Sequence, residues 1–163
     1  MTLLATKLKV SMILFICLII IKPDTASSYV YNSQETHNIQ FLNHGAHSLY
    51  KRIQLIRSAR ESIELETYIF RIDNSGKILL NELMAQAKKG VKVRILIDNH
   101  GAKADFTPYL SYILKTKNIE VRYFNTAPLT QINKVQNRNH RKTLIIGSNI
   151  SIFGGRNVGN EYF

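Results

Sequence analysis

The chain has 163 residues, with 22 Lys and Arg against 11 Asp and Glu, one Cys and a formal net charge of +11. This length allows one domain, and a single cysteine excludes a disulfide framework and a zinc module built on cysteines. The charge favours an anionic partner, namely nucleic acid, a phosphorylated substrate or an acidic membrane surface.

The N-terminal segment has the layout of a secretory signal. Lys7 and Lys9 precede an apolar run over residues 10–21, and small residues follow Pro23. We expect residues 1–27 to be a signal peptide that exports the chain to the periplasm or the medium. The alternative is an uncleaved membrane anchor formed by the apolar run, although that run is shorter than the roughly 20 residues of a spanning helix.

Downstream of a polar lead-in over residues 28–45, apolar residues at helical spacing predict three helices. The first covers residues 46–59. The second begins at the turn cluster Asp73–Gly76 and ends at Lys88–Gly90, where cations in the last turn and a glycine are stop signals. The third is expected to open near residues 105–108.

Strand patterns alternate with these helices. Period-two and β-branched segments predict five strands over residues 62–70, 91–97, 119–124, 142–146 and 150–153. The last two strands are expected to form a hairpin, and residues 125–139 are expected to form a polar loop. This order predicts an α/β fold, a mixed and largely parallel sheet flanked by helices, in a single domain over residues 46–163.

Candidate functional residues follow the strands, because sites in open α/β sheets gather at the carboxyl ends of strands. Three places qualify: Tyr68–Asp73, the pair Asp98 and His100, and the pair His140 and Lys142. For Asp98 and His100, helix capping and solvent exposure are the simpler interpretations. Positive charge near the last pair comes from Arg138, Arg141 and Arg156.

The His-x-Lys pair suggests phosphate chemistry. On a strand, positions i and i+2 share a face, so the His140 imidazole and the Lys142 ammonium would lie side by side. The ammonium can bind a phosphate oxygen and keeps the imidazole neutral and nucleophilic. If the hairpin brings Asn157 back, its amide adds a donor, and the group predicts a phosphodiester site without metal or cofactor. On spacing alone, a His-x-Lys pair more often has no catalytic role.

Several elements together resemble the phospholipase D superfamily, whose signature is His-x-Lys-x4-Asp followed by a Gly-Gly/Ser-x-Asn element. Residues 140–147 read HRKTLIIG, and residues 154–163 read GGRNVGNEYF, an ending similar to the bacterial cardiolipin-synthase-like branch. Residues 68–70 and 87–98 are similar to the first half of that branch.

The resemblance implies a metal-free displacement in two steps, with two His-x-Lys motifs facing each other. One histidine attacks phosphorus and forms a phosphohistidine, and the other protonates the leaving alcohol. Carried over, His140 and Lys142 are the catalytic residues, and Lys142 and Asn157 bind the phosphoryl oxygens. No metal ion or other cofactor is expected.

The chain departs from the family pattern in three ways. The Asp of the motif is Gly147, only one motif is present, and the chain stops at Phe163 directly after it. We therefore expect the domain to be truncated at its C-terminal end. A homodimer or a missing second half would have to complete the site.

Three functions remain open at this point. The first is an exported phospholipase D-type enzyme that hydrolyses or transfers phosphatidyl groups at a membrane surface. The second is a single-motif homodimeric endonuclease acting on nucleic acid, which the basic charge favours. The third is an inactive, truncated or degenerate fragment of a two-motif enzyme.

Overall fold

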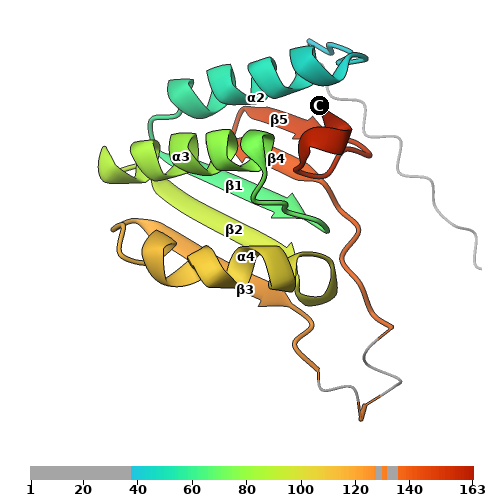
Figure 1. Ribbon diagram of the computed structural model, residues 1–163. Coiled ribbons are helices and arrows are strands. Elements are labelled where there is room, and N and C mark those ends of the chain that lie inside the picture. Colours follow the sequence, from blue (N-terminus) through green and yellow to red (C-terminus); the bar gives the residue numbers. More distant parts are fainter. Residues whose placement is uncertain (1–37, 128–129, 132–135) are drawn as a thin grey trace, which may run out of the picture. The chain divides into compact units, whose positions relative to one another are not determined.

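The computed structural model describes residues 38–127, 130–131 and 136–163 (Figure 1). The predicted signal segment and most of the lead-in lie outside the described residues. The compact unit that carries the candidate site extends from Gln40 to Phe163. Within the described ranges, no helix is long and apolar enough to cross a membrane.

The unit is built on a five-stranded sheet in the order β3-β2-β1-β4-β5. The strands are β1 (Ser62–Thr67), β2 (Lys92–Asp98), β3 (Ile119–Phe124), β4 (Thr143–Ile146) and β5 (Ile150–Phe153). The first three are parallel, β4 is antiparallel to β1, and β5 is antiparallel to β4. The predicted mixed, largely parallel α/β sheet is therefore confirmed, and so is the terminal hairpin.

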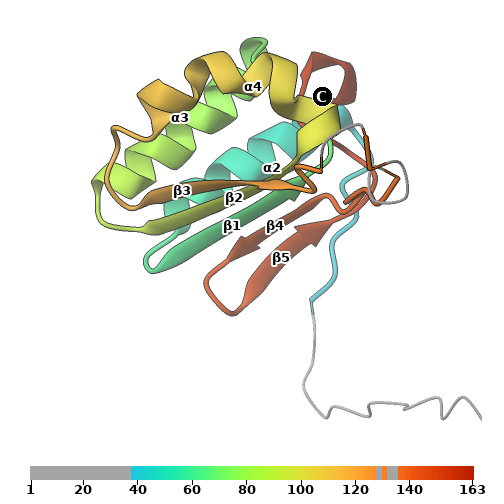
Figure 2. The same ribbon diagram turned by 90° about the horizontal axis from the view of Figure 1, so that it is seen from below.

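Three helices cover the sheet: α2 (Gly45–Ser58), α3 (Asn74–Lys88) and α4 (Asn99–Ile113). Figure 2 shows all three on the same face of the sheet. Side chains on β1 and β2 alternate accordingly, with apolar residues buried under the helices and charged residues on the other face. On that other face Glu64 pairs with Arg94, the neighbour directly across from it on β2.

Two element boundaries differ from the prediction. The third helix begins at Asn99, not near residues 105–108, because the Asp98 side chain caps it and Pro108 lies inside the helix. The first strand ends at Thr67, because the chain leaves the sheet there and Phe70 keeps only an isolated bridge to Val158.

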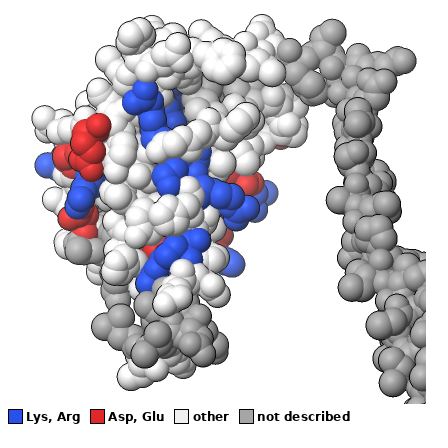
Figure 3. Space-filling model, turned by 90° about the vertical axis from the view of Figure 1, so that its right-hand side faces the viewer, with Lys and Arg blue, Asp and Glu red and all other residues white. Residues whose placement is uncertain are grey.

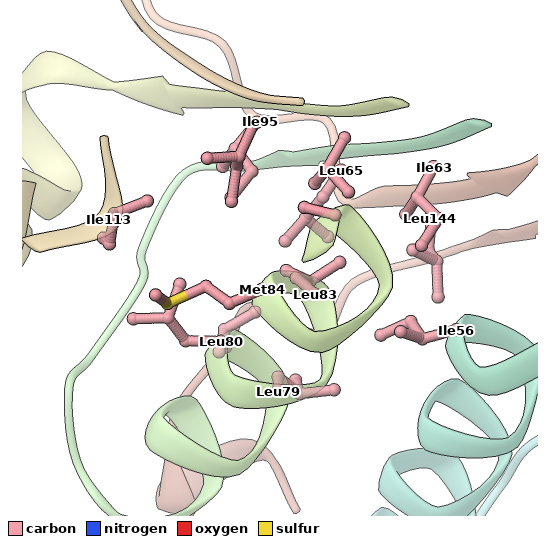
Figure 4. Packing of buried hydrophobic residues seen from close by; sticks show 14 of the residues in the cluster. Ile56, Ile63, Leu65, Leu79, Leu80, Leu83, Met84, Ile95, Ile113 and Leu144 are labelled. Atoms are coloured by element: carbon pink, nitrogen blue, oxygen red, sulfur yellow. The ribbon is translucent and has the colours of Figure 1, made fainter. Parts of the chain in front are cut away.

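The core lies between the sheet and the helices (Figure 4). Leu65 and Ile95 point from β1 and β2 toward Leu83 of α3, and all three are buried. Burial of such side chains stabilises each by roughly 1.5–3 kcal/mol. This core fixes the strand ends, and with them the segments that carry the candidate site.

Candidate active site

The candidate site lies at one edge of the sheet. The parallel strands β1 and β2 end at this edge, and the antiparallel strand β4 begins there. Tyr68, which follows β1, therefore meets His140, which precedes β4. The fold brings together one residue from each of the three places that the sequence indicated, namely Tyr68, Asp98 and His140.

His140 presents an exposed imidazole that rests on an aromatic ring. Its ring stacks on the ring of Tyr68, with centroids 4.3 Å apart and an interplanar angle of 16°. In the part of the chain that the structure describes, neither imidazole nitrogen takes part in a hydrogen bond. Among the described residues, the contact with the Tyr68 ring is therefore the interaction that orients the side chain.

Lys142 places a positive charge beside the same ring. Its Nζ lies 5.6 Å from the centroid of Tyr68 and donates a hydrogen bond of 2.5 Å to the backbone carbonyl of His140. Burial lowers the pKa of Lys142 below its usual value. Among the described residues no carboxylate pairs with this ammonium, which leaves it available to an anionic group.

Asn157 contributes an oriented amide. Its Oδ1 accepts a hydrogen bond from the Ile69 N–H at 3.1 Å and lies 3.4 Å from the Thr67 hydroxyl oxygen. Because a backbone N–H can only donate, the atom facing Ile69 must be the oxygen, and Nδ2 points the other way. Thr67 and Ile69 flank Tyr68, so the hairpin brings this amide donor back to the end of the first strand.

Asp98 ties the segment before His140 to the sheet. Its carboxylate is 0% exposed, and Oδ1 accepts from the His100 N–H at 2.9 Å. Oδ2 accepts from the Asn139 N–H at 3.0 Å. The predicted helix cap is therefore one of two roles of Asp98, and the bond to Asn139 is the other. The bond to Asn139 joins positions 41 apart in the chain, and no sequence pattern signals it.

His100 enters this network through its backbone, while its side chain is exposed. The arginines near the site are engaged in different ways. Arg138 lies 3.6 Å from Asp98, Arg141 lies 2.9 Å from Glu66, and Arg156 donates to backbone carbonyls.

Lys and Arg side chains form a broken line across the face where the strands end. Figure 3 views the molecule from the right-hand side of Figure 1, toward which the arrowheads of β1 and β2 point. No three His, Cys, Asp or Glu side chains gather as a metal site in the described ranges. The face offers cationic and amide donors to an anion.

Gly147, the position where the motif departs from Asp, lies at the opposite edge. It follows β4, and its N–H donates to the Ser62 carbonyl at 2.9 Å, where β1 begins. Its φ of 56° is in the left-handed region, and a Cβ added there would meet nothing within 4 Å. The departure therefore changes the turn between β4 and β5 and does not touch the edge that carries His140.

Comparisons with known sequences identify the family of the chain. The family model of the PLD-like domain of cardiolipin synthase matches residues 52–163. An uncharacterised protein of Helicobacter pylori strain 26695 is 36% identical over 133 residues, which are 75% of this chain and 26% of that protein. Cardiolipin synthase C of Escherichia coli K12 is 34% identical over 125 residues, or 69% and 25% of the two chains. The chain thus spans about a quarter of the length of these curated relatives.

Solved structures share the fold. Phosphatidylserine synthase of Haemophilus influenzae superposes with a TM-score of 0.60 at 20% identity, over 76% of this chain and 29% of that chain. NucT of Helicobacter pylori superposes with a TM-score of 0.55 at 24% identity, over 72% and 71% of the two chains.

Proposed function

The chain belongs to the phospholipase D superfamily, and we propose that it provides one half of a phosphodiester site that acts on phospholipid head groups. One observation carries the proposal. An exposed imidazole, His140, stacks on the Tyr68 ring, which the Lys142 ammonium also contacts, and the Asn157 amide is bonded to the backbone next to Tyr68. This combination supplies a nucleophile and two groups that bind phosphoryl oxygens.

The proposed reaction is a displacement at phosphorus. A nitrogen of the His140 ring attacks, so that an N–P bond forms while the bond from phosphorus to the head-group oxygen breaks. The departing oxygen takes a proton from an acid. Lys142 and Asn157 stabilise the charge on the phosphoryl oxygens. Water, or a second alcohol, then displaces the histidine and completes hydrolysis or phosphatidyl transfer.

In this proposal the acid comes from a second half, because these 163 residues carry a single His-x-Lys motif. A second copy of the chain, or a second half with its own motif, faces His140 and supplies the proton. Residues 1–27 export the chain, which brings the site to a membrane surface. The relatives named cardiolipin synthase support the phospholipid substrate, and the chain covers only a quarter of their length.

The test uses vesicles of phosphatidylglycerol and phosphatidylethanolamine in the presence of a chelator. We expect release or exchange of the head group, and an acid-labile covalent adduct detectable by mass spectrometry of the intact protein. His140→Ala should abolish both signals. His47→Ala, which removes an exposed histidine on α2, is the matched control. Full activity in His140→Ala would overturn the proposal.

A second measurement tests the need for another half. If two copies build the site, specific activity should fall on dilution as dimers dissociate in analytical ultracentrifugation. A strictly monomeric protein that turns over lipid with no added partner would contradict this part of the proposal.

Nucleic acid is the second candidate substrate. The line of Lys and Arg side chains across the site face favours it, because phosphate neutralisation drives non-specific binding. Cleavage of DNA that resists chelators, weakens with salt and disappears in His140→Ala would identify this activity. If neither substrate is turned over while the protein is folded, the chain is the inactive fragment.

A further inference from the structure

We propose that Tyr68 is a positioning residue whose ring holds the His140 imidazole in the orientation required for attack on phosphorus. The proposal rests on the function proposed above and assigns a role to a side chain that the His-x-Lys motif does not contain. Three observations carry it, and each concerns a different contact of the Tyr68 ring or backbone.

The first observation is the stack itself. The two rings are nearly parallel, at 16°, with centroids 4.3 Å apart. His140 is exposed and, within the described residues, its ring makes no hydrogen bond that could fix its plane. Without Tyr68 the imidazole would rotate about its side-chain torsions like any surface histidine. The aromatic contact is thus the interaction that selects one orientation.

The second observation is that the Tyr68 ring is itself fixed. The residues on both sides of Tyr68 are bonded, since Asn157 accepts from the Ile69 N–H and the Thr67 hydroxyl donates to the Ile69 carbonyl at 2.8 Å. Gly101 of α4 packs directly on it. A Cβ at position 101 would lie 2.2 Å from the Tyr68 carbonyl oxygen and 3.2 Å from its Cδ1.

The third observation is that Lys142 contacts the same ring, at 5.6 Å from its centroid. The Tyr68 ring therefore touches both side chains of the His-x-Lys motif. It is a common support that fixes their relative placement, and a support of this kind acts on the geometry of attack more than on the binding of substrate.

The stacking geometry suits the chemistry. The lone pair of an imidazole nitrogen lies in the ring plane, whereas stacking covers only the ring face. Tyr68 can therefore restrain His140 and leave the attacking edge free. When the N–P bond forms, the imidazole ring becomes cationic, and the electron-rich face of a tyrosine favours a nearby cation. The Tyr68 hydroxyl is not needed for either effect.

The variants follow from this reasoning. Tyr68→Phe keeps the ring and removes the hydroxyl, while Tyr68→Leu removes the ring, and Tyr68→Met is a second ring-free variant in case Leu does not fold. Tyr112→Leu is the matched control, because Tyr112 is an exposed tyrosine of α4. Thermal unfolding establishes that each variant is folded.

The first readout is NMR of the His140 ring protons in the protein without substrate. The ring current of Tyr68 should shift these protons away from free-histidine values. We expect the shift to persist in Tyr68→Phe and Tyr112→Leu and to vanish in both ring-free variants. A His140 spectrum that is unchanged in the folded ring-free variants would overturn the proposal. This readout requires no turnover, so it tests the stack of Tyr68 on His140 separately from the proposed function.

The second readout is steady-state kinetics on the vesicles described above. Loss of the ring should lower kcat about tenfold and leave KM within about twofold, whereas Tyr68→Phe should stay within twofold of the wild type. A residue that only packed the fold would change thermal stability without this split. Equal kcat in the wild type and in folded Tyr68→Leu would overturn the positioning role.

Discussion

Replacement of Asp98 by Asn tests how the segment before His140 is held in place. The two side chains have the same shape, and Asn is also a good N-cap. If its oxygen keeps the cap bond to the His100 N–H, its NH2 group must face the Asn139 N–H, which donates to the carboxylate in the wild type at 3.0 Å. Two donors then meet at a buried position.

The expected cost follows from these contacts. A buried donor left without an acceptor costs about 1–3 kcal/mol. The carboxylate is 0% exposed, so water cannot replace the lost partner, and the nearby Arg138 guanidinium also loses its counter-charge at 3.6 Å. We therefore expect Asp98→Asn to lower the free energy of unfolding by about 2–3 kcal/mol. Asp98→Ala should lose about 1 kcal/mol more, because the cap disappears as well.

Urea unfolding followed by circular dichroism measures this difference. Asp73→Asn is a matched control, since Asp73 caps α3 through Gly76 and accepts from the distant Asn160 N–H at 2.6 Å, with its side chain only partly buried. Asp73→Asn should lower the free energy of unfolding by less, about 1 kcal/mol, because water can reach the Asp73 side chain. If the free energy of unfolding of Asp98→Asn is within about 0.5 kcal/mol of the wild-type value, or falls no more than that of Asp73→Asn, the bond to Asn139 does not anchor the segment before His140.

Arg52→Met should raise the free energy of unfolding by about 1 kcal/mol, since burial lowers the pKa of Arg52 to about 10 and its partners among the described residues are Ser48 and the Phe163 ring, with no carboxylate. A drop in the thermal midpoint would contradict this. Gly147→Asp should cost about 1 kcal/mol at most and leave head-group release within twofold, because Asp tolerates a positive φ and the turn is remote from His140. A large change in kcat would show that the two edges are coupled. Gly101→Ala should destabilise by about 1–3 kcal/mol and shift the His140 ring protons, because the new methyl displaces Tyr68. Unchanged NMR spectra in this variant would refute the contact.

The sheet and the helices could be predicted because their signals are local. The period-two pattern of residues 91–97 gives β2 to within one residue at each end. The stripe Leu79, Leu80, Leu83 and Met84 gives α3, and all four side chains are buried. The same alternation in β1 places Glu64 on the face opposite the helices, where it pairs with Arg94.

The details of the site could not be predicted, because they are contacts between distant segments. The stack of Tyr68 on His140 depends on the order of β1 and β4 in the sheet, and no spacing in the sequence encodes that order. The predicted start of α4 was wrong because Pro108 resembles a helix opening, whereas the Asp98 cap, about three turns earlier, sets the true start. The placement of α2, α3 and α4 on the same face of the sheet also depends on how distant segments assemble.

The strand β4 separates the two ends of the family motif in space. His140 precedes this strand and Gly147 follows it, so roughly 20 Å of extended chain lies between the phosphate chemistry and the turn. A substitution near His140 would therefore bear on the proposed reaction, whereas a substitution at Gly147 bears on closure of the hairpin. A score that counts how many motif positions match treats the His140 end and the Gly147 end as equivalent. In this chain the departure from Asp lies in the hairpin turn, and the groups proposed to bind and attack phosphate lie at the opposite end of β4.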